Sequence, residues 1–127
     1  MKDAVTSKPA ILIDLKKYRI RIHKNTLYLL GNPEYIMFLV NPSDRIIAIR
    51  CGTKSDRYAH RINWESITNR KSYELYSSIF VQALKKICAE WQGTRSYRIY
   101  GEIIPNVGIA QFRMSDSIAI DESQVMD

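Results

Sequence analysis

The clearest pattern in the chain is an alternation of apolar and polar residues just after the apolar run Ala10–Leu15, which itself predicts a strand. The apolar members of the alternation are Tyr18, Ile20 and Ile22, two residues apart. A period of two predicts a strand with one buried face. The remaining positions are all cationic or titratable, and we expect them to line the exposed face of this strand: Lys17, Arg19, Arg21 and His23.

A short helix and a hairpin are predicted next. Lys24–Leu30 fits two helical turns at most, and Gly31 followed by Pro33 predicts the end of that helix. The runs Tyr35–Val40 and Ile46–Ile49 are apolar on both alternating faces, which indicates central strands covered on two sides. The segment between them begins with Asn-Pro, which favours a type I turn and therefore a hairpin.

The second part of the chain predicts the same order of elements after a polar stretch, Cys51–Lys71, that holds one short strand. A strand at Tyr73–Tyr76 leads into the main helix, Ser77–Gln92, and two further strands follow at Tyr97–Ile104 and Ile109–Met114. Apolar residues recur in the helical region at three- and four-residue steps and form one face. They are Tyr76, Phe80, Ala83, Leu84, Ile87, Cys88 and Trp91.

These elements predict an α+β fold in a single domain, 1–127. Two strand-helix-hairpin halves, at about 10–52 and 72–115, share one core, and the ends at 1–9 and 116–127 are flexible. We expect a small mixed β-sheet or a swapped-hairpin-like barrel with one main amphipathic helix.

The charge of the chain adds a functional expectation. The 127 residues carry a net charge of +6, which favours an anionic partner such as nucleic acid. Residues 14–71 hold 12 Lys and Arg against 5 Asp and Glu. No apolar run approaches the ~18–20 residues of a membrane span, so no membrane contact is expected. Cys51 and Cys88 form no disulfide framework, which favours a reducing cytoplasm.

The segment Arg19–Lys24 reads R-I-R-I-H-K, and it is followed by a short helix ending at Leu30-Gly31 and by the hairpin at 35–50. This order resembles the swapped-hairpin unit of the AbrB, MazE and MraZ proteins, which begins with a strand of the form R-I-x-I-x-K. MraZ-like proteins carry two such units in one chain. The resemblance implies a dimeric or pseudo-dimeric barrel that presses basic strand and loop residues on DNA.

The candidate nucleic-acid contacts follow from this resemblance and from the residues. Arg19, Arg21 and Lys24 match the family pattern, and Lys17 is added because it shares their face. The polar stretch adds arginines beside Tyr58 and Trp64, and rings can stack on exposed bases. The alternative for this stretch is a solvated connection with Trp64 packed on the core. The full set of candidates is Lys17, Arg19, Arg21, Lys24, Arg57 and Arg61.

Catalysis and metal binding have less support. Cys51, His60 and Asp56 are the residue types of a thiol nucleophile site, but nothing in their spacing secures the required hydrogen bonds. The two histidines and two cysteines do not have zinc-site spacing, and no glycine-rich phosphate loop occurs. We therefore expect no cofactor and no enzyme. The preferred function is non-catalytic DNA binding, as a transcriptional regulator or mobile-element accessory protein. The alternative is a protein-interaction or oligomerisation module, such as a homodimer, without nucleic-acid binding.

Overall fold

The computed structural model describes residues 8–120, which form nine strands, three α-helices and a 3₁₀ helix. The elements in chain order are β1 (Ala10–Asp14), β2 (Arg19–His23), α2 (Lys24–Leu29), β3 (Tyr35–Asn41), β4 (Ile46–Cys51), β5 (His60–Arg61), α3 (Trp64–Ile67), β6 (Ser72–Tyr76), α4 (Ser78–Ile87), β7 (Ser96–Ile104), β8 (Ile109–Arg113), η1 (Met114–Asp116) and β9 (Ile118–Ile120). The fold is therefore a mixed one in which strands dominate, as the α+β prediction requires.

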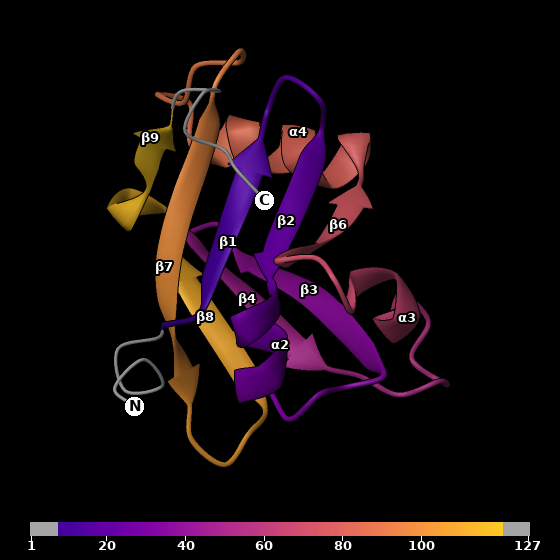
Figure 1. Cartoon of the computed structure of the whole chain (residues 1–127). Helices are drawn as coiled ribbons and strands as arrows, with labels where there is room; N and C mark the ends of the chain where they lie inside the picture. Colours follow the sequence, from indigo (N-terminus) through magenta and orange to yellow (C-terminus); the bar gives the residue numbers. More distant parts are fainter. Residues whose placement is uncertain (1–7, 121–127) are drawn as a thin grey trace.

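The strands form one curled sheet with the order β5-β3-β4-β8-β7-β1-β2-β6, and β9 pairs with β7. In Figure 1, β7, β1 and β2 cross over β3, β4 and β8. Every ladder between the described strands is antiparallel, so the predicted mixed sheet is corrected to an antiparallel one. The long strand β7 lies along β1 through its first part and along β8 through its last.

Corresponding strands of the two halves pair with one another. β2 pairs with β6, and β4 pairs with β8. The other pairings also match: β1 pairs with β7, and β5, the counterpart of β1, pairs with β3, the counterpart of β7. The run β5-β3-β4-β8-β7-β1 reads the same backwards when each strand is exchanged for its counterpart. A two-fold axis has this effect, so the two halves are related by a pseudo-two-fold.

Backbone hydrogen bonds outside the ladders obey the same relation. Cys51 N donates to Gly108 O at 3.1 Å, and Met114 N donates to Arg45 O at 2.8 Å. Arg45 and Gly108 both end their hairpin turns with positive φ, 56° and 64°. The two hairpin turns are therefore equivalent in pairing and at their last residue, although Asn106 in the second turn also has a positive φ, 68°.

The relation fails at one edge of the sheet. β1 is paired with β2 over four residues, but the described ladders include none between β5 and β6. The hydroxyl of Tyr73 on β6 donates instead to the carbonyl of Arg61 on β5 at 3.1 Å. The sheet is thus curled toward a barrel and remains open on this side.

One core lies inside the curled sheet and takes residues from both halves. Ile13, Ile22 and Ile49 are fully buried with Phe112 and Leu84 of the second half. Burial of this apolar surface is the main favourable contribution to folding, and each half supplies only part of the buried surface. The central strands β1 and β4 are consequently apolar on the face that meets this core.

The helix of the second half is shorter than predicted. α4 ends at Ile87 rather than Gln92, and it buries Val81 and Leu84 while Ile79 is 85% exposed. Ser77 caps its first turn by accepting from the amide of residue 80 at 3.2 Å.

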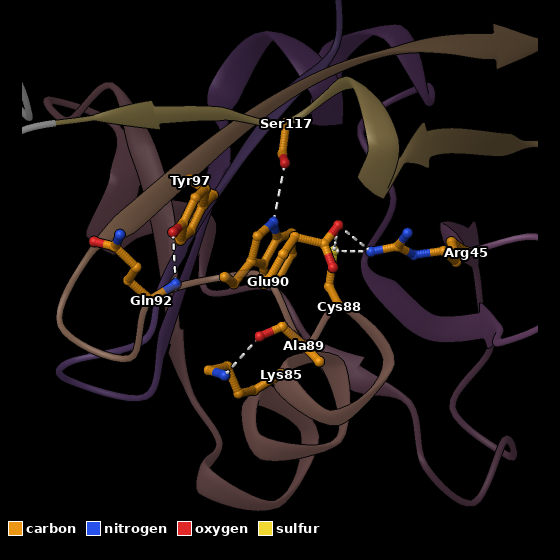
Figure 2. A network of polar contacts seen from close by, with 9 residues as sticks. Arg45, Lys85, Cys88, Ala89, Glu90, Gln92, Tyr97 and Ser117 are labelled. Carbon is orange, nitrogen blue, oxygen red and sulfur yellow. Dashed lines mark hydrogen bonds and ion pairs between the residues drawn. The ribbon is translucent and has the colours of Figure 1, made fainter.

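Side-chain contacts explain why the helix stops (Figure 2). Arg45 Nη2 lies 2.6 Å from Cys88 Sγ and also bonds the Glu90 carboxylate, which fixes the chain just after α4. Trp91 Nε1 donates to Ser117 Oγ at 3.0 Å. These partners come from the first hairpin and from the segment before β9, so helical periodicity alone could not show them.

The ends of the described chain also differ from expectation. Residues 116–120 complete η1 and form β9, where the sequence predicts a flexible end. At the other end, Pro9 is buried, and its carbonyl accepts from Gly101 N at 2.9 Å. Residues 1–7 and 121–127 of the predicted flexible ends lie outside the described part. Among residues 8–120, no helix combines the length and the apolar character needed to cross a membrane.

Candidate nucleic-acid interface

Two of the predicted contact residues, Arg19 and Arg21, are engaged within the sheet. Arg19 is only 9% exposed, and its Nη2 lies 2.8 Å from Asp14 Oδ2. Glu74 Oε2 lies 3.6 Å from Arg19 Nη1 and 2.9 Å from Arg21 Nε. The expectation that these arginines line an open face is therefore wrong. β2 lies between β1 and β6, and each neighbour supplies a carboxylate.

The electrostatics of Arg19 follow from this setting. Burial by itself lowers its pKa, but the hydrogen bond and charge of Asp14, with the charge of Glu74, raise the pKa overall. The guanidinium stays charged and is neutralised locally. Leu12 stands between Arg21 and Arg98 in the sheet, so the arginine stems cover an apolar side chain on the outer surface.

Lys17 lies in the turn before β2 rather than in the strand. The carboxylate of Asp14 accepts from Lys16 N and Lys17 N, both at 3.1 Å. Tyr18 has a φ of 53°, and β2 begins at Arg19, so the alternating strand begins two residues later than predicted. Both lysines are exposed, as is Tyr76 at the end of the neighbouring strand. We call Lys16, Lys17, Tyr18 and Tyr76 the turn corner.

Lys24 lies at the opposite end of β2, where it joins a second basic group. Its backbone N–H donates to Lys71 O at 2.8 Å, and its Nζ donates to the carbonyls of Ile67 and Thr68 at 3.1 and 2.9 Å. Arg70 and Lys71 are exposed beside it.

Aromatic rings flank this second group. Tyr28 is 51% exposed and stacks on Trp64 with ring centroids 6.2 Å apart and planes 7° from parallel. Lys24 Nζ lies 5.9 Å from the centre of the Tyr28 ring. The Trp64 indole is fixed by donating to Pro33 O at 3.0 Å. We call Lys24, Tyr28, Trp64, Arg70 and Lys71 the helix corner.

The helix corner was only partly predicted. The sequence predicts Lys24 and the arginines of the polar stretch Cys51–Lys71 as separate contacts, and only the pairing of β2 with β6 brings Lys24 beside Lys71. The sequence could have suggested this contact if the two strands had been recognised as equivalent, because a basic residue lies next to one end of each strand. Tyr28 has no such signal, since a tyrosine in a short helix commonly packs inward.

Arg57 and Arg61 are exposed, but their side chains contact residues that belong to neither corner. The Arg57 guanidinium is 5.5 Å from the centre of the Tyr58 ring. Arg61 Nε lies 3.8 Å from Glu34 Oε2 on the surface, a distance at which an exposed ion pair adds little.

The three residues of the thiol hypothesis have separate partners. Cys51 Sγ contacts Leu30 O at 3.3 Å, and Asp56 accepts from Thr53 N at 2.6 Å. His60 packs edge-on against Phe38. Burial raises the pKa of Cys51 and lowers that of His60, so neither group is driven toward its charged form. Within residues 8–120, no group of three or more potential ligands could hold a metal ion.

Comparison with known proteins adds no family: no protein-family model, curated protein or solved structure matches the chain. The corners and the sheet face are therefore interpreted from their own chemistry.

Proposed function

We propose that the protein is a non-catalytic DNA-binding protein and that the helix corner is its main contact surface. The observation that carries this proposal is the 2.8 Å hydrogen bond from Lys24 N to Lys71 O, which joins two basic segments distant in sequence. Exposed cations beside an aromatic stack suit a phosphate backbone with its sugars and bases.

The distribution of charge supports the same surface. Arg19 and Arg21 are matched by Asp14 and Glu74, so they contribute little to the outer potential. Arg70 and Lys71 are exposed, and no ion pair among the described residues involves them. The net charge of +6 is therefore expressed mainly at such positions, where phosphates can displace counterions.

We further infer that the two halves are units of the swapped-hairpin type seen in AbrB, MazE and MraZ proteins, with α4 as the principal helix. Support comes from the repeated strand-helix-hairpin order and from the pairing of β2 with β6 and β4 with β8. A regulatory or mobile-element accessory role fits such a unit. A cytoplasmic setting fits the two free thiols, Cys51 and Cys88.

The test is a titration of duplex DNA at several salt concentrations with the parent and with Arg70→Ala/Lys71→Ala. Losing two phosphate contacts should lower the slope of log K against log salt by roughly two. Arg113→Ala removes one exposed charge on β8 and serves as the control, with little change expected. A parent without salt-dependent binding would refute the proposal, as would a double variant with the parent's slope.

A second candidate, a protein-interaction module without nucleic-acid binding, is favoured by the exposed apolar side chains. Ile79 is 85% exposed, and Leu39 is 40% exposed on the outer face of β3. Concentration-dependent self-association in sedimentation, together with no DNA binding at low salt, would favour this candidate over the first.

A further inference from the structure

The helix corner and the turn corner occupy equivalent places at the two ends of one ladder. Lys24 N donates to Lys71 O at 2.8 Å at the first, and Ser77 N donates to Tyr18 O at 2.9 Å at the second. The ladder between them pairs β2 and β6 over their full lengths. Lys71 and Tyr18 are therefore equivalent residues, and the residues just before them are equivalent cations. These are Arg70 and Lys17.

The pseudo-two-fold axis passes through the middle of this ladder. Arg21 faces Glu74 at its centre, so the two central residues form an ion pair, with Arg21 Nε 2.9 Å from the carboxylate. Arg19 is likewise matched by Asp14. The arginines of the β2–β6 ladder are thus matched by carboxylates, and exposed lysines and Arg70 lie beyond both of its ends.

The separation of the corners can be set by strand geometry. Six residue steps of about 3.3–3.4 Å along the ladder place the two hydrogen bonds that close it about 20 Å apart, and Lys17 and Arg70 lie one residue beyond these bonds. Figure 1 shows the β1–β2 turn at the top of β2 and α2 at its lower end. Duplex DNA advances about 3.4 Å per base pair, so 20 Å corresponds to about six base pairs.

We propose that the two corners bind one DNA duplex together, with the pseudo-two-fold axis of the protein lying over a two-fold axis of the duplex. This inference rests on the proposed function and specifies its partner as double-stranded. The two antiparallel backbones of a duplex present equivalent phosphates to equivalent cations, as in dimeric proteins whose symmetry matches that of their sites. A single strand has one direction and offers no such pair.

The experiment compares Lys17→Ala, Arg70→Ala and the double variant on a duplex stem of about 12 base pairs, with Arg113→Ala as a charge-matched control. Each single change should lower the slope of log K against log salt by roughly one, and the double change by roughly two. Binding should saturate at one duplex per protein. A single strand of the same length should bind more weakly and lose less on Lys17→Ala.

The outcomes separate this inference from the function on which it rests. Salt-dependent binding that responds to Arg70→Ala but not to Lys17→Ala would refute the shared duplex and leave DNA binding standing. Saturation at two duplexes per protein would do the same, because each corner would then hold its own ligand. A parent without salt-dependent binding would refute both. Circular dichroism of each variant confirms that a lost contact is not a lost fold.

Discussion

The two corners close the same ladder with opposite chemistry. At the turn corner an anion holds the backbone: Asp14 accepts from Lys16 N and Lys17 N and pairs with Arg19. At the helix corner a cation holds the backbone, because Lys24 Nζ donates to two carbonyls at the end of α3. The comparison shows that a basic side chain at the end of a ladder can remain exposed, where a ligand can reach it, or can form hydrogen bonds within the protein.

The largest expected effect comes from removing the anion. Asp14→Asn would leave Arg19 without its closest counter-charge in a site where both side chains are almost buried. Breaking such a pair typically costs about 3–5 kcal/mol, and Glu74 at 3.6 Å compensates only partly. Urea denaturation should show this loss in the free energy of unfolding.

Asp44→Asn is the matched control, since Asp44 is exposed in the first hairpin turn. It should change stability by no more than about 0.5 kcal/mol. Equal stabilities for the two variants would mean that the turn corner does not depend on Asp14.

The second effect concerns the helices that start at the two corners. Leu84 on α4 and Leu27 on α2 are both fully buried. Leu84→Ala and Leu27→Ala should each cost on the order of 2–5 kcal/mol, because each leaves a cavity in the same core. Thermal melts of the two variants would show whether the helices are equivalent. A parent-like melt for either would remove that helix from the core.

Local pattern predicted much of this fold. The alternation through Ile20 and Ile22, and the prolines that start both hairpin turns, act over a few residues and are legible in any window. Both hairpins and the helix after β2 were accordingly predicted to within a few residues. β9 was missed because three residues in an acidic tail carry too short a pattern.

The candidate site was less predictable because it depends on partners distant in sequence. Arg19 and Arg21 alternate like residues of an exposed face, and only the neighbouring strands reveal Asp14 and Glu74 beside them. Lys24 matched the family pattern, yet its ammonium is directed at the end of α3. Periodicity indicates which side of a strand a residue occupies, but it does not indicate what faces that side.

The third effect tests how the turn corner starts α4. The Ser77 hydroxyl accepts from Phe80 N at 3.2 Å, so Ser77→Ala should cost about 1 kcal/mol. Ser78→Ala lies one residue further and removes no cap, which makes it a suitable control. A difference in unfolding midpoint between the two variants measures the cap. Identical midpoints would place the start of α4 under the control of tertiary packing alone.

The smallest effect decides what Lys24 is for. Lys24→Met keeps most of the side-chain length and removes only the ammonium that contacts Ile67 O and Thr68 O. A cation at the C-terminus of a helix is worth about 0.3–1 kcal/mol, and α3 is short and partly exposed, so a loss in this range is expected. DNA affinity should fall less for Lys24→Met than for Lys71→Ala, because the Lys71 side chain is exposed and Lys24 is held by carbonyls. The measurement pairs urea denaturation with a DNA titration at one low salt concentration. If Lys24→Met left stability unchanged and removed most of the binding, the ammonium would be a phosphate ligand, and the two corners would differ less than their hydrogen bonds indicate.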